Sequence, residues 1–286
     1  MTEACTKIIS EHTTQHKPVV PFLKWAGGKR WFVSRYSNLL PTTFDTYIEP
    51  FLGAASVYFY LEPAQAILSD LNTDLIDTYI GVRDNWKSLQ NSLRYRQKRH
   101  DNSPSYYYFV RKKMPIDLTQ RASRLIYLNR TCFNGIYRVN KDKQFNVPRG
   151  TKNSVILETD DFYTISKLLK NAELVSSDFE PVINRANPND FVFADPPYTV
   201  LHNNNGFRKY NDVLFSWNDQ QRLATTLLCA AKRGVKIICT NANHDSIRSL
   251  YDFPEFSLQI ISRYSRISAN RKGRKDVEEL VIRANI

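Results

Sequence analysis

The feature that most constrains this chain is a repeated succession of short apolar segments, ending near acidic residues, and segments with helical periodicity. Strands and helices that alternate in this way are typical of a parallel sheet covered by helices. Strands are expected at residues 46–51, 65–70, 173–177, 190–195 and 235–240, helices at 54–61, 72–82 and 217–232, and an antiparallel hairpin at 256–263 and 277–284. Ser216 and Asp219 have the spacing of a capping box before the helix at 217–232. These patterns predict an α/β fold.

The middle of the chain, residues 86–157, has a different character because it is rich in Arg, Lys and Tyr. Residues 121–128 have helical spacing, whereas glycine and proline in residues 134–150 favour a loop or hairpin. We interpret the stretch as an insertion into the sheet. The three consecutive tyrosines that begin at Tyr106 are expected to pack among its helices, and His244 is expected to be a loop or cap residue.

The charge of the chain favours a polyanionic partner. Its 40 Lys and Arg residues outnumber its 28 Asp and Glu residues, which gives a formal net charge of +12. Basic side chains that neutralise phosphates release counterions, which favours binding to nucleic acid. The same charge also fits a basic protein without such a partner.

Cysteine spacing and hydropathy argue against a metal site, disulfides and a membrane span. Cys5, Cys132, Cys229 and Cys239 are too scattered for a zinc knuckle or a redox pair, so we expect reduced thiols in the cytoplasm. No apolar run approaches the ~20 residues that a membrane span needs. The first residues are polar and lack the apolar core of a secretory signal, so they are expected to form a short tail.

The most specific motif is Asp195-Pro196-Pro197-Tyr198, which directly follows the apolar run at residues 191–194. Open α/β sheets bind ligands at the carboxyl ends of their strands. Prolines lack the N–H donor but keep the carbonyl acceptor. A carboxylate and a neighbouring carbonyl could therefore accept both N–H bonds of an exocyclic aromatic amine, while Tyr198 offers a face on which a base can stack. We interpret these four residues as a catalytic motif rather than as an ordinary turn.

Two further patterns point to a cofactor. Residues 49–56 run from a strand through Gly53 into a helix, and glycine lets the backbone approach a ligand closely. Asp70 ends the next strand, at about the spacing of an acid that binds ribose hydroxyls. Together they predict a site for an adenosine-containing cofactor, although the turn alone fits plain packing equally well. Residues 24–29 place Trp25 beside two glycines, which is unusual for a residue that only packs.

These patterns, in this order, resemble the Dam family of DNA adenine-N6 methyltransferases. The similarity extends through residues 129–140, 145–148, 241–245 and 268–280, and so covers nearly everything from Pro21 onward. It implies transfer of a methyl group from S-adenosylmethionine to N6 of adenine in double-stranded DNA, at GATC and by base flipping. It further implies a monomer that acts in the cytoplasm of a bacterial cell, at the nucleoid, with a host or a phage as its source.

The resemblance also implies a division of the chain. Residues 21–72 and 158–286 are expected to form a Rossmann-like class I methyltransferase domain, residues 73–157 an inserted, mainly helical target-recognition domain, and residues 1–20 a tail. Ala55 departs from the family, since many relatives carry a third glycine at its position in the cofactor turn.

Carried over residue by residue, the resemblance assigns roles to individual side chains. The catalytic positions are Asp195, Pro196, Pro197 and Tyr198, and the cofactor-binding positions are Trp25, Lys29, Phe51, Gly53, Asp70, Asp178, Phe179 and Asp195. The DNA-contacting positions are Lys24, Phe133, Asn134, Ile136, Arg138 and Pro148, and we expect Arg271, Lys272 and Arg274 of the basic loop 265–275 to contact phosphates. Arg138 has the chemistry to bond O6 and N7 of one guanine.

Two other functions stay open. An amino methyltransferase that acts on RNA or protein usually carries Asn-Pro-Pro, whereas this chain has Asp195. A catalytically inactive DNA-binding module would not need intact cofactor and catalytic motifs. The sequence leaves open whether an active enzyme would serve restriction–modification, host marking or phage protection.

Overall fold

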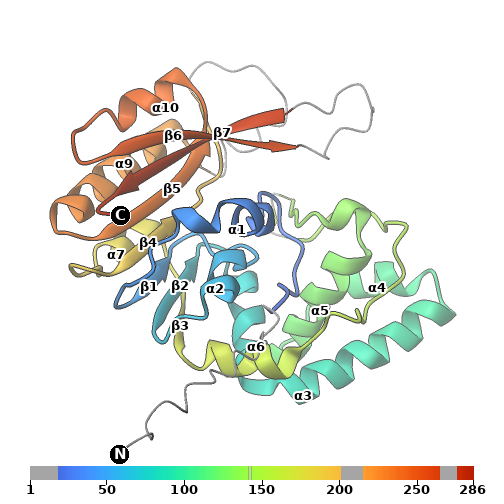
Figure 1. Cartoon of the computed structure of the whole chain (residues 1–286). Helices are drawn as coiled ribbons and strands as arrows, with labels where there is room; N and C mark the ends of the chain where they lie inside the picture. The colour runs from blue at the N-terminus through green and yellow to red at the C-terminus, as the bar shows by residue number, and fades with distance from the viewer. Residues whose placement is uncertain (1–18, 141, 143, 201–214, 265–275) are drawn as a thin grey trace, which may run out of the picture.

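The computed structural model describes residues 19–140, 142, 144–200, 215–264 and 276–286, and its strands form one sheet. The strands are β1 (Tyr47–Glu49), β2 (Ala66–Asp70), β3 (Ala172–Ser176), β4 (Phe191–Ala194), β5 (Lys236–Ala242), β6 (Ser257–Tyr264) and β7 (Asp276–Ala284). Their order across the sheet is β3-β2-β1-β4-β5-β7-β6. The first five strands in this order run parallel, and β7 lies antiparallel between β5 and β6. Figure 1 shows this arrangement, which confirms the expected α/β fold and C-terminal hairpin.

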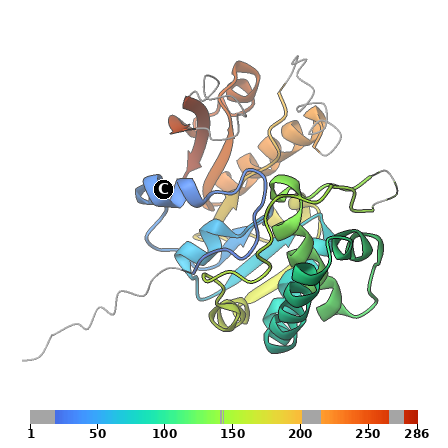
Figure 2. The ribbon, with the colours of Figure 1, turned by 90° about the vertical axis from the view of Figure 1, so that its right-hand side faces the viewer.

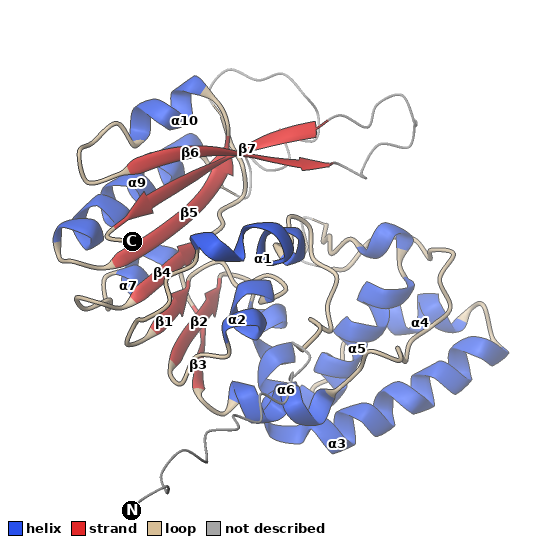
Figure 3. Cartoon of the chain, viewed as in Figure 1, coloured by secondary structure: helices blue, strands red, loops and turns tan. Residues whose placement is uncertain are grey.

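The central strands β1 and β4 and most of β5 are buried on both faces, which explains their largely apolar sequences. In β4, Phe191 and Phe193 belong to one hydrophobic cluster, whereas Val192 and Ala194 belong to the other. The first cluster includes residues of α1 (Arg30–Tyr36), α2 (Ser56–Leu61), α3 (Thr73–Asn102), α5 (Leu118–Thr131) and α6 (Phe162–Leu169). The second includes residues of α7 (Phe179–Ile183), α9 (Trp217–Lys232) and α10 (Asp245–Leu250). Figure 3 shows the helices around the strands.

The helix expected at residues 72–82 is much longer than the sequence indicated. It begins where Asn72 caps the N–H of Leu75 and continues as α3 for 30 residues, with non-helical backbone angles at Asn85. Beyond this kink the helix buries Leu89 and Leu93 and packs against α5. Many long polar side chains surround these few apolar positions, so the periodicity was too weak to reveal the continuation. Figure 2 shows α3 and α5 beside each other, away from the C-terminal hairpin.

Several local expectations are confirmed. Ser216 and Asp219 form both halves of a capping box at α9. Tyr106 and Tyr107 lie in α4 (Tyr106–Lys112) and are buried, so they pack as expected. The expectation is wrong for Tyr108, which lies on the outer side of the same helix and is 48% exposed. His244 caps α10, because its imidazole accepts the N–H of Ser246.

The segment 134–150 is a loop tied together as a hairpin. One antiparallel bridge joins Val139 to Phe145, and a second, at its base, joins Cys132 to Arg149. A short 3-10 helix, η2 (Phe133–Gly135), lies at its start. The two bridges therefore hold its two arms together.

Candidate active site

The Asp-Pro-Pro-Tyr motif lies directly after β4, at the carboxyl end of the parallel strands. Asp195 is anchored there by two partners on one oxygen. The hydroxyl of Thr240 donates to its Oδ1 at 2.7 Å, and Nζ of Lys29 lies 2.6 Å from the same atom. Thr240 reaches it because Ala194 is paired with Cys239, which places Thr240 one step further along β5. The second carboxylate oxygen of Asp195 has no partner among the residues that the structure describes.

The two prolines differ in what their carbonyl oxygens contact. The side-chain amide of Gln220, a fully buried residue of α9, donates to the carbonyl of Pro197 at 3.2 Å. Gln220 in turn accepts a hydrogen bond from Asn241 at 3.0 Å. No donor in the described part of the chain bonds the carbonyl of Pro196. Within the described part of the chain, the motif therefore has one carbonyl and one carboxylate oxygen without a hydrogen-bond partner.

Tyr198 is fixed at its hydroxyl. The hydroxyl donates to Oε2 of Glu279 on β7 at 2.7 Å, and Nζ of Lys29 lies 5.3 Å from the ring centroid. Burial, the charge of Asp195 and the charge and hydrogen bond of Glu279 raise the pKa of Tyr198 well above its ordinary value. The phenol therefore holds its proton more tightly than an ordinary tyrosine.

The glycine turn after β1 joins three of the predicted cofactor residues. The N–H of Gly53 donates to Oδ2 of Asp70 at 3.2 Å, and the N–H of Asn72 donates to Oδ1 at 2.9 Å. A Cβ atom on Gly53, whose φ is +48°, would lie 3.0 Å from Cδ1 of Trp25. The ring of Trp25 is itself stacked on Tyr137, with centroids 5.3 Å apart. Glycine is required here by both the backbone angle and the indole.

Asp178 and Phe179 lie next to this turn. The rings of Phe51 and Phe179 stack with centroids 5.5 Å apart. Both carboxylate oxygens of Asp178 accept from Arg222, at 2.6 and 2.9 Å, and the guanidinium lies 4.2 Å from the Phe179 centroid. The hydrogen bond from Arg222 lowers the pKa of Asp178. Nothing in the sequence had singled out Arg222.

The predicted DNA-contacting residues of the hairpin are all exposed or half-buried: Phe133, Asn134, Ile136, Arg138 and Pro148. Nζ of Lys24 donates to the carbonyl of Asn134, and Asn129 bonds the backbone of Lys24 through both ends of its amide, at 2.9 and 2.7 Å. The segment before α1 is thereby attached to the hairpin. Arg271, Lys272 and Arg274 lie outside the described residues.

Comparison with known proteins identifies the chain. The family described as "D12 class N6 adenine-specific DNA methyltransferase" matches residues 25–267 of this chain. The chain belongs to the D12 class of N6 adenine-specific DNA methyltransferases. The type II methyltransferase M.MjaIII of Methanocaldococcus jannaschii is 37% identical over 92% of this chain and 98% of its own length. The type II methyltransferase M1.LlaDCHI of Lactococcus lactis is 33% identical over 92% of this chain and 94% of its own length. The DNA adenine methylase of Serratia marcescens is 31% identical over 91% of this chain and 96% of its own length.

The D12-class site also contains residues that sequence reasoning missed. Thr240, Gln220 and Glu279 each satisfy one polar group of the Asp-Pro-Pro-Tyr motif, but they come from β5, α9 and β7. A faint signal existed for Glu279, since an acidic residue directly before the apolar run 280–282 is unusual on a buried strand. Glu49 was noticed only as part of the glycine turn. It is 4% exposed, and its Oε2 has no hydrogen-bond partner among the described residues.

Lys29 lies beside the Asp-Pro-Pro-Tyr motif. Besides Asp195, its Nζ contacts the carbonyl of Gly27 at 3.1 Å and lies 3.8 Å from Oε2 of Glu279. Its side chain is almost fully buried. A basic side chain thus lies beside the carboxylate of Asp195, and the role of Lys29 toward the cofactor stays a prediction.

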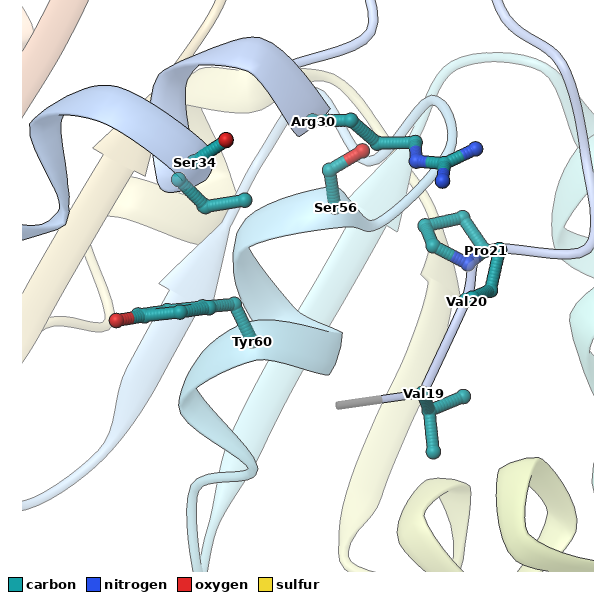
Figure 4. A pocket seen from close by; sticks show the side chains of 8 residues that line it. Val19, Val20, Pro21, Arg30, Ser34, Ser56 and Tyr60 are labelled. Atoms are coloured by element: carbon teal, nitrogen blue, oxygen red, sulfur yellow. The ribbon is translucent and has the colours of Figure 1, made fainter. Parts of the chain in front are cut away.

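Other features lie apart from this site. A hollow of about 240 Å³ between the start of the described chain, α1 and α2 is lined by none of the predicted site residues (Figure 4). Within the described ranges, no group of three His, Cys, Asp or Glu side chains could hold a metal ion, and no helix is long and apolar enough to cross a membrane. Cys132, Cys229 and Cys239 are free thiols.

Proposed function

We propose that this D12-class enzyme uses S-adenosylmethionine to methylate adenine within GATC sites of double-stranded DNA, and that it flips the target base out of the helix. A stacked and paired adenine does not expose N6 to a protein site, so the base must leave the stack. The single observation that carries the proposal is a pair of acceptors beside the Tyr198 ring, Oδ2 of Asp195 and the carbonyl of Pro196, which have no donor among the residues that the structure describes.

These acceptors suit an exocyclic amine. The two N–H bonds of N6 would donate to Asp195 and Pro196, which draws the nitrogen lone pair out of conjugation with the ring. When the methyl group passes to the nitrogen, its bond to sulfur would break and release a neutral thioether, and the nitrogen would carry positive charge until one N–H proton is lost. An oriented carboxylate and a carbonyl dipole would stabilise that charge. Tyr198 would stack on the purine, and Lys29 and Thr240 would hold Asp195 in place.

The residues around Gly53 suit S-adenosylmethionine, which supplies an electrophilic methyl group on a positively charged sulfur. Asp70 could bind ribose hydroxyls, while Phe51 and Phe179 offer apolar surface to an adenine edge near Asp178. Trp25 and Lys29 complete the predicted set. Glu49 adds a buried carboxyl oxygen without a partner in the described part of the chain, which suits a cationic ligand.

The exposed hairpin suits DNA. Phe133 and Asn134 could fill the space that a flipped base leaves, and Lys24, Ile136, Arg138 and Pro148 would contact the same duplex. We assign these contacts to a target-recognition domain of residues 73–157, inserted into a catalytic domain of residues 21–72 and 158–286. We further infer a monomer that acts on DNA at the nucleoid of a bacterial cell.

Asp195→Ala tests this function. Transfer of labelled methyl groups from S-adenosylmethionine to plasmid DNA that lacks adenine methylation should fall ~10²-fold or more, because an electrostatic contact in a closed site is lost. Asp252→Ala, at an exposed position, is the control. A folded Asp195→Ala protein with near-normal turnover would contradict the catalytic role. Sequencing of the modified bases tests the target, and methylation without preference for GATC would overturn it.

A further inference from the structure

Glu279 is a buried acid with an unusual set of partners. It lies on β7, which pairs with β5 on one side and with β6 on the other. Glu279 is paired with Ala242 of β5 and with Ile261 of β6. Its exposed fraction is 1%. A carboxylate buried this deeply is unfavourable unless it is paired, so its partners must account for its presence.

The two carboxylate oxygens contact different groups. Oε2 accepts the hydrogen bond from Tyr198 and lies 3.8 Å from Nζ of Lys29. Oε1 lies 2.6 Å from Nε of Arg263 on β6, in an ion pair. Asp195 and Glu279 thus face Lys29 and Arg263, two acids against two bases. Glu279 connects Tyr198 to this cluster of two acidic and two basic side chains.

We propose that Glu279 is a positioning residue for methyl transfer, which fixes the Tyr198 ring through its hydroxyl so that the target base stacks over Asp195 and the Pro196 carbonyl. The inference rests on the proposed role of Tyr198. Backbone geometry alone leaves the ring free to rotate about its side-chain bonds. A hydrogen bond at the far end of the side chain removes that freedom, and Lys29 lies over the ring while it holds Asp195. One carboxylate thereby links the stacking surface to the acceptor.

A purely structural role would look different. If Glu279 only balanced the charge of Arg263, its loss would reduce stability without depending on the hydroxyl of Tyr198. If it positions the ring, its effect on methyl transfer must disappear once that hydroxyl is absent. The coupling between the two side chains therefore separates the roles.

Glu279→Gln and Tyr198→Phe are the informative variants. A glutamine oxygen can accept from Tyr198 or face Arg263, but not both, since its NH₂ group would then oppose the guanidinium. Tyr198→Phe keeps the ring and the charge of Glu279 and removes only the hydroxyl. Glu278→Gln is the matched control, because Glu278 is the exposed neighbour on the same strand.

The experiment measures single-turnover methylation of adenine-unmethylated plasmid DNA, the affinity for S-adenosylmethionine and the melting temperature of each protein. Each single variant should lower the methylation rate ~10-fold or more, since small misplacements of reacting groups are costly. Cofactor affinity should stay unchanged, and the double variant should be no slower than the slower single variant. Glu278→Gln should match the unmutated enzyme.

Three results would overturn the inference. The first is an unchanged rate in folded Glu279→Gln. The second is a double variant whose loss is the product of the single losses, and the third is a loss confined to cofactor affinity. If the unmutated protein methylates no adenine, the proposed function itself fails and the inference falls with it. The unmutated enzyme therefore distinguishes the two failures.

Discussion

The side-chain amide of Gln220 satisfies the carbonyl of Pro197, at 3.2 Å, whereas no donor among the described residues bonds the carbonyl of Pro196. Gln220 lies on α9 and is separated from Pro197 by 23 residues of chain. Asn241 holds the other end of its amide. A side chain of α9 thereby occupies the carbonyl of Pro197 and not that of Pro196.

Gln220→Leu should therefore destabilise the protein and slow methyl transfer. It leaves the Pro197 carbonyl and the Asn241 amide without partners, and each unsatisfied buried group costs about 1–3 kcal/mol. Denaturant unfolding measures the first effect and turnover the second. Gln221→Leu, at the exposed neighbouring position, should change stability by less than about 0.5 kcal/mol. Equal effects of the two changes would show that the Gln220 amide is unimportant.

Ala55→Gly should stabilise the protein. Ala55 has φ +54°, in the left-handed region, and it is 1% exposed. The left-handed conformation costs an L-residue with a side chain roughly 1–2 kcal/mol, so glycine relieves this strain in the folded state. The greater conformational freedom of glycine in the unfolded state offsets about 0.4–1 kcal/mol of that stabilisation. The melting temperature should rise slightly. Ala54→Gly, where φ is not positive, should lower it, and a drop for Ala55→Gly would mean that the methyl group packs better than its backbone strain costs.

Asp70→Asn should weaken the binding of S-adenosylmethionine. The carboxylate already orders the glycine turn through Gly53 and Asn72, and its charge would be lost as an acceptor for ribose hydroxyls. A hydrogen bond to a charged group contributes about 1.5–3 kcal/mol, which corresponds to an affinity loss of roughly 10- to 100-fold. Calorimetry measures it, with Asp77→Asn as a control on α3. Unchanged affinity in a folded Asp70→Asn protein would exclude the assigned role.

Arg138→Ala should relax selectivity at one base pair. Nε of Arg138 donates to Asn146 at 2.9 Å, and no acceptor among the described residues binds its other two nitrogens, which suits a two-point contact with guanine. The lost discrimination should be ~1–3 kcal/mol, measured as methylation rates on GATC and its single-base variants. Neutralising Arg271, Lys272 and Arg274 should instead weaken binding to all duplexes alike and make the salt dependence of binding shallower. A uniform loss for Arg138→Ala would make it a phosphate contact.

Glu49→Gln should flatten the pH dependence of stability. Burial raises the pKa of Glu49 well above 4.5, so the folded state holds this proton more tightly than the unfolded state. Stability from this group is present at acidic pH and falls as the pH rises from the unfolded-state pKa towards the folded-state pKa, by about 1.4 kcal/mol for each pH unit between them. Gln removes that loss. The cofactor-free Gln variant should therefore be more stable than the unmutated protein at neutral pH, and the difference should shrink in acid.

Glu173→Gln provides the control of opposite sign. Its hydrogen bond from Arg185 lowers the pKa of Glu173, so its contribution is present at neutral pH and is lost on acidification. The pair is exposed, and its effect should be small. If Glu49→Gln destabilises the protein at neutral pH, then Glu49 is ionised and paired in the folded state.

The sequence by itself determined the local features of this protein. Residues 191–194 show by their continuous apolar character that they form a strand buried on both faces, and Asp195 to Tyr198 must then lie at its carboxyl end. The positions of Gly53, in the turn after its strand, and of Asp70, at the end of its strand, follow in the same way. These inferences succeed because the periodicity of side chains along a strand or helix is a property of the local chain. The second half of α3 escaped because its few apolar residues give a weak period.

Only the tertiary structure decided which distant side chains complete the motif. Tyr198 and Glu279 are 81 residues apart, and they meet because β7 inserts between β5 and β6 in the sheet. Lys29 reaches Asp195 from the start of α1. Periodicity records which face of an element is buried, but the strand order and register depend on how all the elements pack together. The sequence around Glu279 therefore does not indicate that its carboxylate accepts a hydrogen bond from Tyr198.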